Sequence, residues 1–354
     1  ALERSFPAAQ AAAELDRMAA ASTTATGPAG EQRPLWHRQY VVPFFLACVI
    51  LACNQATGVN SIIAYCANML IQAGLSDAQA HLGYVLLTLV NFVVTLAGVA
   101  LVDRLGRKRL LSLGTAGIMV FLLATGLLCR QVESHRVDVP MAVQFLVDPE
   151  NQTASVPFDD AAATMLGSAN MTPPATLVVV YSFGDYTAAS KVVRSDEPGA
   201  QLELNRESCL PANRVASFFQ NPWADWAAAQ VAPMQIRHAI ITQVPSVAHG
   251  WLMAGCIFGF MACFAVGPGV CVWLALSELM PTRIRSNGMS IALLINQAVS
   301  TAIAAVFLPT VGQHGYAAMF FVFAACTLVY FIAATFFLPE TKGKTLEEIE
   351  AGFK

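Results

Sequence analysis

The sequence has 354 residues, of which 56% are hydrophobic and only 12% are charged. Soluble domains carry about 25% charged residues, so this composition excludes a disordered chain and argues against a soluble enzyme. The formal net charge of −3 provides no basic field, which excludes nucleic-acid binding. The mean hydropathy of +0.56 predicts a protein that crosses the lipid bilayer several times.

The first 39 residues are expected to form a polar cytoplasmic segment, in which residues 8–21 are Ala-rich and favour a helix. Six largely apolar runs follow, each long enough to cross a hydrocarbon core of ~30 Å. The runs are about 40–65, 82–102, 110–129, 249–279, 288–310 and 315–338. Because six is an even number, both ends of the chain are expected on the same side of the membrane.

Among the short loops between spans and the tail, basic residues lie on one side only. They are Arg104, Arg107, Lys108, Arg109, Arg283, Arg285, Lys342 and Lys344. The loops around 74–80 and 311–314 contain no Lys or Arg. Since cytoplasmic loops carry an excess of Lys and Arg, the basic side is predicted to face the cytoplasm. We therefore expect a multi-pass protein of the plasma membrane.

These signals divide the chain into five segments. Residues 1–39 precede the first span, 40–129 hold three spans, 130–247 form an insertion, 248–338 hold three more spans, and 339–354 form a tail. The insertion is expected outside the cell. It is acidic, with 7 Lys/Arg and 12 Asp/Glu.

Two sequons in the insertion, at Asn151 and Asn170, predict glycosylation and agree with an extracellular position. Residues 141–147 and 176–181 favour strands, which predicts a small folded module. Cys129 and Cys209 lie on the outer side, where a disulfide can form. A disulfide and two free thiols are equally compatible with the sequence.

Amide side chains occupy the middle of the first span, at Asn54, Gln55 and Asn60. Amides in hydrocarbon are costly without hydrogen-bond partners, and each offers both donors and acceptors. They predict either contacts with a polyhydroxylated ligand or hydrogen bonds between helices. Asn54, Gln55 and Ser61 are expected on one helical face, and Gly58 is expected to allow local unwinding.

Amide residues recur in two other spans, and the fourth span contains a helix-breaking motif. Asn91 lies in the second span and Asn296-Gln297 in the fifth, which favours a shared polar cavity. The fourth span contains Gly267-Pro268-Gly269, which predicts a break in the helix. Trp273 follows four residues later and is predicted to stack on an apolar ring face of a ligand. The alternative for Trp273 is a lipid-facing position.

Glu278 is the acidic residue nearest to the middle of a span. It is either a solvated flank of the fourth span or the partner of Arg285 or of the loop 104–108, closing the inner side in one state. No HExxH, Walker A or GxSxG motif occurs, and the cysteines lack zinc spacing. We therefore predict no enzyme activity, no cofactor and no metal.

Five segments, in this order, resemble motifs of the sugar porter family of the major facilitator superfamily. They are Asn54-Gln55-Ala56-Thr57-Gly58-Val59-Asn60 with Tyr65, Asp103-Arg104-Leu105-Gly106-Arg107-Lys108, Gly267-Pro268-Gly269 with Trp273, Glu278-Leu279-Met280-Pro281 with Arg285, and Pro339-Glu340-Thr341-Lys342-Gly343. The resemblance implies an all-α membrane fold in which the six spans are helices seven to twelve. It also implies that the amino-terminal six helices, which would be this chain's partner half, are absent from the sequence.

The resemblance also implies roles for individual residues. Sugar contacts fall on Asn54, Gln55, Asn60, Asn91 and Trp273. Gating falls on Gly267, Pro268, Gly269, Asp103, Arg104, Arg107, Glu278 and Arg285. Asn54 replaces the family's Gln, Ala64 the first residue of a double Tyr, and Gln297 a Trp that is common in hexose facilitators. These departures argue against a standard glucose facilitator.

The long outer loop between the implied helices nine and ten resembles the proton-coupled myo-inositol transporters of the family. The loop lacks their dense cysteines, which favours the protozoan type. The implied function is proton/myo-inositol symport by alternating access, with the proton-coupling residues in the absent half. The alternatives are a proton-independent hexose facilitator and a non-transporting nutrient sensor. The short tail, 339–354, argues against the sensor.

Overall fold

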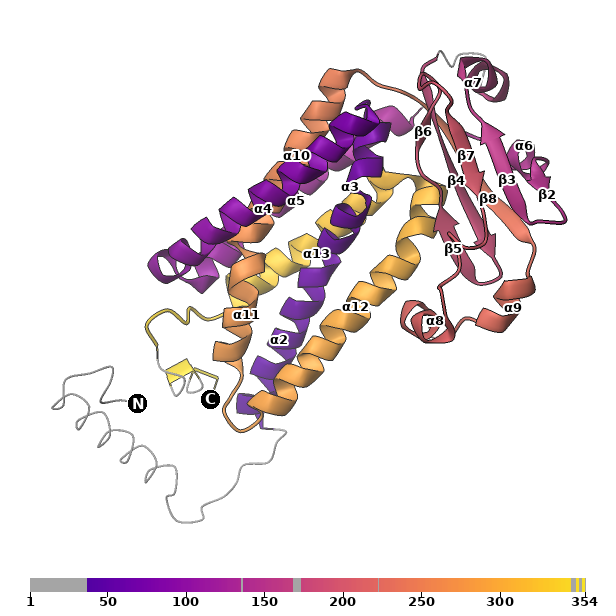
Figure 1. Cartoon of the computed structure of the whole chain (residues 1–354). Helices are drawn as coiled ribbons and strands as arrows, with labels where there is room; N and C mark the ends of the chain where they lie inside the picture. Colours follow the sequence, from indigo (N-terminus) through magenta and orange to yellow (C-terminus); the bar gives the residue numbers. More distant parts are fainter. Residues whose placement is uncertain are drawn as a thin grey trace, which may run out of the picture.

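The structure, a computed structural model, describes residues 37–134, 136–167, 173–221, 223–344, 348–349 and 352–353. The helix expected over residues 8–21 lies outside these ranges. The described chain forms a helical bundle with a mixed α/β module at one end (Figure 1). We call this end the insertion end and the opposite one, which holds the loop 104–108, the basic end.

Eight α-helices and a π-helical turn form the bundle. They are α2 (Arg38–Ala56), α3 (Val59–Gln72), α4 (Asp77–Leu105), α5 (Arg107–Glu133), α10 (Val247–Val266), α11 (Pro268–Leu279), α12 (Arg285–His314), α13 (Tyr316–Ile332) and η2 (Ala333–Phe337). Within the described residues, six continuous stretches are long and apolar enough to span a membrane, with α2–α3 and α10–α11 each counting as one. This confirms the six predicted spans.

Both predicted helix breaks are present. α2 ends before Gly58, whose φ of +78° lies in the left-handed region that favours glycine. A Cβ at this position would lie 2.3 Å from the ring of Phe323, so the close packing also requires glycine. The second break lies at Gly267, where α10 ends, and Pro268 begins α11 at a position that tolerates its missing N–H.

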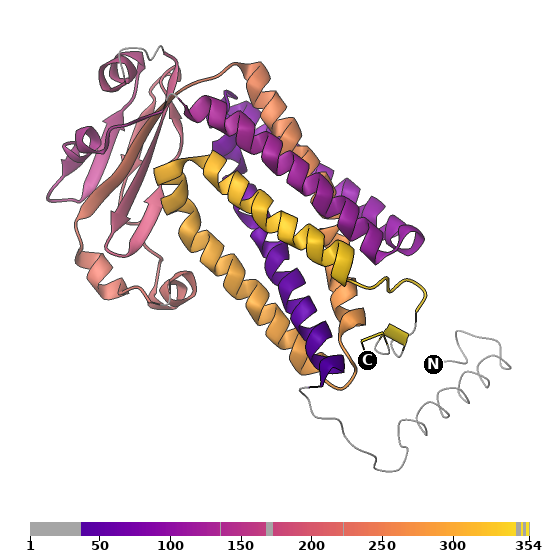
Figure 2. The same ribbon diagram turned by 180° about the vertical axis from the view of Figure 1, so that it is seen from behind.

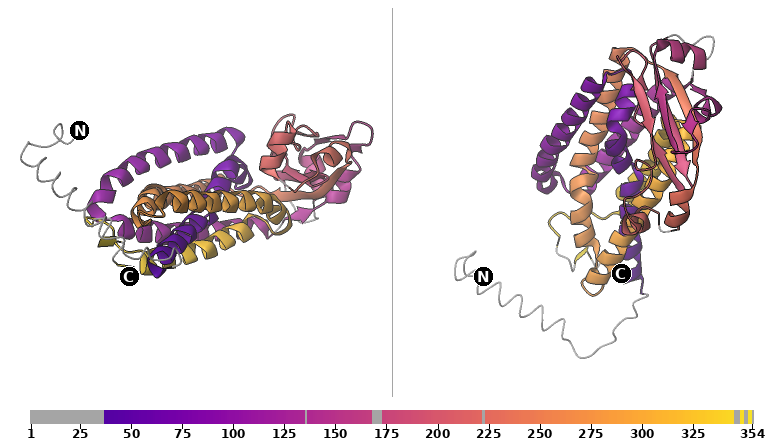
Figure 3. Two further views of the ribbon diagram at one scale, coloured as in Figure 1. Left: turned by 90° about the horizontal axis from the view of Figure 1, so that it is seen from below. Right: turned by 45° about the vertical axis from the view of Figure 1, so that its right-hand side comes forward.

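α5 packs against three other helices of the bundle, α13, α10 and α11. α4 and α12 lie on opposite sides of the bundle in Figure 1, and α4 forms its outer edge in the left view of Figure 3. Only 17% of the most apolar stretch of α4 and of α12 is buried, compared with 44% to 50% in the other four spans. These two helices therefore present long apolar faces outward.

The insertion contains two antiparallel sheets and four short helices. The first sheet holds β1 (Val137–Asp138), β4 (Ala175–Phe183), β5 (Tyr186–Ala189), β6 (Val193–Arg194) and β8 (Met234–Gln243), and the second holds β2 (Val147–Asp148), β3 (Thr153–Pro157) and β7 (Gln201–Leu204). The helices are α6 (Pro140–Gln144), α7 (Asp160–Leu166), α8 (Arg214–Gln220) and α9 (Trp226–Val231).

Of the two strands predicted in the insertion, one is confirmed and one is mostly wrong. Residues 176–181 lie within β4, the long strand that pairs with β8 over most of its length. Residues 141–147 instead form most of α6 and reach β2 only at their end. Pro140 explains the difference, because its fixed φ favours the first position of a helix.

The module has its own core and also joins that of the bundle. Phe158, Tyr181 and Phe183 are fully buried inside it. Val192, between β5 and β6, belongs instead to the buried core of the bundle, which includes residues of α3 and α13. From behind, the sheet lies against the ends of α12 and α13 (Figure 2).

Cys129 and Cys209 are both buried and both free. Cys129 belongs to the bundle core and Cys209 to the module core, so the two thiols lie in separate clusters. The disulfide alternative is therefore wrong for this structure. Burial raises the pKa of the Cys209 thiol to about 11, which keeps it protonated and unreactive at neutral pH.

Candidate functional site

A cavity of about 240 Å³ lies beside the break in the first span. It is lined by Gln55, Gly58, Asn60, Ser61, Ala64, Tyr65, Ser300, Ile303 and Ala304. Sites for drug-sized ligands enclose about 300–1,000 Å³, so this cavity suits a smaller molecule. Its walls come from α2 and α3, which are neighbours in the chain, and from α12, which is far from both in the sequence.

A short hydrogen-bond chain crosses the cavity wall. Asn60 Nδ2 donates to Gln55 Oε1 over 2.9 Å and to Ser300 Oγ over 3.1 Å. Residues five apart in a continuous helix point in different directions, at 100° per residue, so the break at Gly58 brings Gln55 and Asn60 together. Two amides and a hydroxyl offer both donors and acceptors, which matches the hydroxyl groups of a polyol.

An aromatic stack begins at the cavity, with Tyr65 in its lining. The Tyr65 ring stacks on Phe307 with centroids 4.9 Å apart, and Phe307 stacks on Phe323 at 6.3 Å. Phe323 packs directly against Gly58. The position of Tyr65 is therefore fixed by the same contacts that require glycine at the break.

Of the five residues for which the sequence predicts sugar contacts, the structure brings Gln55 and Asn60 into the cavity. The other three do not line it. Asn54 is buried, and its backbone carbonyl accepts the Thr57 hydroxyl. Asn91 is half-buried on α4, where its backbone carbonyl accepts the Thr95 hydroxyl. Trp273 is 45% exposed at the bundle surface.

The expectation that Asn54, Gln55 and Ser61 share one face is wrong for Asn54. Neighbouring residues in a helix are rotated by about 100°, so Asn54 points away when Gln55 faces the cavity. Ser61 still lines the cavity because the chain changes direction at Gly58.

The α12 wall was not predicted. Its residues, Ser300, Ile303 and Ala304, follow Asn296 at spacings of four, seven and eight. This is the spacing of one helical face, so the pattern was present in the sequence. Asn296 itself is buried and does not line the cavity, and Gln297 is exposed.

At the basic end, Arg107 joins two helices. Its guanidinium lies 3.3 Å from Asp103 Oδ1 on α4 and 3.1 Å from Glu278 Oε1 on α11. Of the two partners predicted for Glu278, the structure pairs it with the loop 104–108. The pairing with Arg285 is not formed, because the Arg285 Nε donates to the Met280 carbonyl over 3.2 Å.

Glu340 extends this network to the tail. Its carboxylate accepts the backbone N–H of Arg107 at 3.2 Å, and those of Thr341 and Lys342 at 3.1 Å. Lys342 Nζ donates in turn to the carbonyl of Arg104 at 2.6 Å. The start of α5 is thus held by residues of two predicted gating motifs and of the tail.

The sequon at Asn151 lies in an exposed turn before β3, and its Nδ2 donates to Asp148 Oδ2 over 2.7 Å. This hydrogen bond lowers the pKa of the Asp148 carboxyl. Asn170 lies outside the described residues. Among the described residues, no group of three or more His, Cys, Asp and Glu side chains is arranged to hold a metal ion.

The sequence matches one protein family over most of its length. The model of the family "Sugar (and other) transporter" matches residues 2–147 and 226–353. The chain belongs to this family. The unmatched stretch, 148–225, lies within the insertion, and the matched stretches contain every cavity residue.

Curated relatives of the sugar transporter family are similar over most of the chain. The human "Proton myo-inositol cotransporter" is 26% identical over 87% of this chain and 44% of the relative. The mouse "facilitated glucose transporter member 12" is 24% identical over 83% and 44%, and the Bombyx mori "Facilitated trehalose transporter Tret1" is 22% identical over 90% and 41%. The chain therefore spans less than half the length of these relatives.

Among solved structures, the proton:xylose symporter XylE of E. coli aligns with 16% identity. The alignment covers 88% of this chain and 42% of that chain, with a TM-score of 0.49.

Proposed function

We propose that this chain forms one six-helix half of a secondary transporter for a sugar or polyol. The cavity with Gln55, Asn60 and Ser300 is the observation that carries the proposal, since its polar groups match ligand hydroxyls. The apolar outer faces of α4 and α12 and the greater length of the relatives support a second half that covers this one. The transporter would work by alternating access around the cavity.

Within this class, we propose myo-inositol as the substrate and a proton as the coupled ion. The support is the human relative named a proton myo-inositol cotransporter, together with the long acidic insertion. The proton-coupling residues would lie in the other half. The relatives named facilitated glucose transporters favour a second candidate, a hexose facilitator without proton coupling.

The cavity would select among substrates because a substrate that lacks a matching hydroxyl leaves a cavity amide without a partner. A buried amide without a partner costs about 1–3 kcal/mol, so a substrate lacking a matching hydroxyl binds more weakly. Asn54, Asn91 and Trp273 remain predicted contacts of the complete transporter. Bending at Gly267 to Gly269 and opening of the Arg107 pairs would change access to the two sides.

The orientation in this proposal follows the basic residues. The basic end would face the cytoplasm and the insertion the exterior, with Asn151 and Asn170 as glycosylation sites, in the plasma membrane.

Uptake of radiolabelled myo-inositol by the complete protein tests the substrate and the coupling. We expect uptake that a protonophore blocks and that unlabelled glucose does not compete. Uptake that glucose competes and the protonophore leaves unchanged would establish the hexose facilitator instead.

The cavity is tested by Gln55→Ala in the complete protein. We expect substrate affinity to fall about tenfold with normal expression, because one net hydrogen-bonding group is lost. Asn68→Ala is the matched control, since Asn68 is an amide on α3 that does not line the cavity. Unchanged affinity in Gln55→Ala would refute the cavity as the binding site.

A further inference from the structure

α3 is a short half-helix that carries four residues of the cavity. It runs for 14 residues between the break at Gly58 and a loop at the insertion end. Helices shorter than about 12–15 residues are marginal on their own, so the position of α3 depends on what holds its ends. Asn60, Ser61, Ala64 and Tyr65 all lie in its first two turns.

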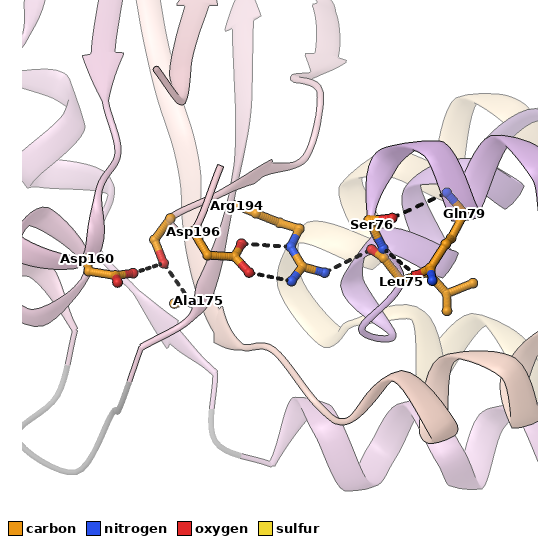
Figure 4. Close-up of polar contacts among 8 residues, drawn as sticks. Leu75, Ser76, Gln79, Asp160, Ala175, Arg194 and Asp196 are labelled. Carbon is orange, nitrogen blue, oxygen red and sulfur yellow. Dashed lines mark hydrogen bonds and ion pairs between the residues drawn. The ribbon is translucent and has the colours of Figure 1, made fainter. Parts of the chain in front are cut away.

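The far end of α3 is held by a residue of the insertion. Arg194 Nη1 donates to the Leu75 carbonyl over 2.9 Å, across 119 positions of sequence (Figure 4). A cation is favourable beside the carbonyl-rich end of a helix. The next residue, Ser76, begins α4 with a capping box that includes Gln79. The Arg194 contact therefore lies at the junction of two spans.

Arg194 is oriented for this contact. Its Nε and Nη2 donate to the two carboxylate oxygens of Asp196 over 2.9 and 2.7 Å, and its side chain is largely buried. Such a two-bond pair fixes the plane of the guanidinium and directs its third nitrogen at Leu75. The Arg194 guanidinium also lowers the pKa of the Asp196 carboxyl.

The strand that carries Arg194 is itself fixed to the module. Ser195 Oγ donates to Asp160 Oδ1 over 2.6 Å and accepts the Ala175 N–H over 3.0 Å (Figure 4). These bonds join β6 to the start of α7 and to β4. The backbone that carries Arg194 is therefore attached to two other elements of the module.

The loop after α3 has little room to move. Gly74 has a φ of +109°, and a Cβ there would lie 2.5 Å from the Pro245 carbonyl. Pro245 belongs to the segment that links β8 to α10. The loop is thus enclosed between Arg194 on one side and this linker on the other.

From these contacts we propose that Arg194 is a positioning residue for the cavity. By fixing the end of α3 to the insertion, it fixes where Asn60 and Tyr65 stand relative to Gln55 and Ser300. The insertion thereby sets substrate affinity without touching the substrate. This inference rests on the proposed function of the cavity, and it assigns a task to the insertion, most of which the family model does not match.

The test compares substrate affinity and hydrogen exchange in the complete transporter. The probe is radiolabelled myo-inositol, or D-glucose if uptake identifies a hexose. Arg194→Ala is expected to weaken binding about five- to tenfold, the size of one lost net hydrogen bond. Amide exchange should become faster in residues 59–72 and stay unchanged in residues 38–56.

Arg206→Ala is the matched control. Arg206 also donates to a backbone carbonyl, that of Ala232 over 2.9 Å, but this bond lies inside the module. We expect Arg206→Ala to leave substrate affinity and α3 exchange unchanged. If both variants lower affinity equally, the effect is loss of module folding and the positioning role of Arg194 is wrong.

Two conservative variants keep the test valid if Arg194→Ala does not fold. Asp196→Asn keeps the shape but weakens the pair that orients Arg194, and should change affinity in the same direction by a smaller factor. Arg194→Lys keeps one donor and should restore part of the affinity.

The outcomes separate this inference from the proposed function. If Gln55→Ala weakens binding but Arg194→Ala and Asp196→Asn do not, the inference is overturned and the proposed function stands. If the wild-type protein binds neither probe, the proposed function fails, whatever exchange shows. Faster exchange in α3 with unchanged affinity would also overturn the positioning role.

Discussion

The two ends of the bundle are held by arginines that bind different kinds of partner. At the basic end, Arg107 binds the carboxylates of Asp103 and Glu278, which are side chains on other helices. At the insertion end, Arg194 binds the Leu75 carbonyl, which belongs to the backbone. Side chains can exchange partners, whereas a backbone group at a helix end keeps its position as long as the helix exists.

Other contacts at the insertion end follow the same pattern. Glu133 accepts the backbone N–H groups of Tyr316 and Ala317 at the start of α13, over 2.6 and 3.2 Å. Arg136 donates to the Gln313 carbonyl near the end of α12. The signs of charge suit the helix dipoles, since the carboxylate meets an N-terminus and the arginine a C-terminus. The insertion end is therefore built as a fixed attachment.

The basic end is less permanent. The Asp103 side chain is 80% exposed, so its pair with Arg107 is weakened by solvent and salt. Contacts with the backbone occur there too: Glu340 accepts the Arg107 N–H, and Lys342 and Arg285 donate to the carbonyls of Arg104 and Met280. From the exposed Asp103 pair we predict that a conformational change of the bundle would remake contacts at the basic end while the insertion end moves as a unit.

The largest predicted effect comes from substituting Gly58, at the break between α2 and α3 that lies between the two ends of the bundle. Gly58→Ala places a Cβ in a left-handed backbone position, which costs about 1–2 kcal/mol, and against the Phe323 ring. We expect lower thermal stability and at least tenfold weaker substrate binding, because Gln55 and Asn60 no longer meet. Thermal unfolding and ligand titration in detergent measure both.

The control for Gly58 is Gly255→Ala in α10, where no atom lies within 4 Å of the added Cβ. Alanine is the better helix former by about 1 kcal/mol, so this variant should be as stable as the wild type or more so. Equal thermal stability and equal substrate binding in the two variants would contradict a special role for the break at Gly58.

The next largest effect is expected at the basic end. Arg107→Ala removes the link between α4, α5 and α11, and should slow turnover about tenfold while leaving substrate affinity within about twofold. Arg109→Ala, an exposed arginine two residues later, is the control. Transport rates and equilibrium binding on the same preparations distinguish the two quantities. Normal turnover in Arg107→Ala would show that the basic end does not control the cycle.

Features set by local sequence patterns could be predicted, whereas contacts between distant helices could not. The six spans and the breaks at Gly58 and Gly267 follow from local patterns of apolar residues, glycine and proline, and they are confirmed. The choice between Arg285 and the loop 104–108 as partner of Glu278 depends on a distance between helices, which local patterns do not contain.

The insertion end was the least predictable part. The β-branched run 176–181 indicated a strand, but the contact of Arg194 with Leu75 joins residues 119 positions apart. Neither residue is unusual in its own segment. In the cavity, Asn54 was wrongly grouped with Gln55 because one residue of rotation decides which amide faces inward.

The smallest predicted effect concerns pH at the insertion end. Hydrogen bonds from Arg194 hold the pKa of Asp196 below its ordinary value of 3.8. A carboxyl with a lowered folded-state pKa contributes stability above its unfolded pKa and loses it only as the pH falls through the folded value. Attachment of α3 should therefore be unchanged between about pH 7 and about pH 5. Hydrogen exchange of residues 59–72, corrected for the intrinsic rate, measures this.

The His238–Asp138 pair makes this small effect informative. His238 Nδ1 lies 2.6 Å from Asp138 Oδ2, on the face of β8 that meets Gly312 of α12. If α3 exchanges faster already at about pH 5, the Arg194–Asp196 pair alone does not account for the attachment, and His238→Gln tests whether the contact of β8 with α12 contributes to it. If exchange is constant in both proteins, the attachment depends on the Arg194–Asp196 pair. The insertion end would then stay fixed between about pH 7 and about pH 5.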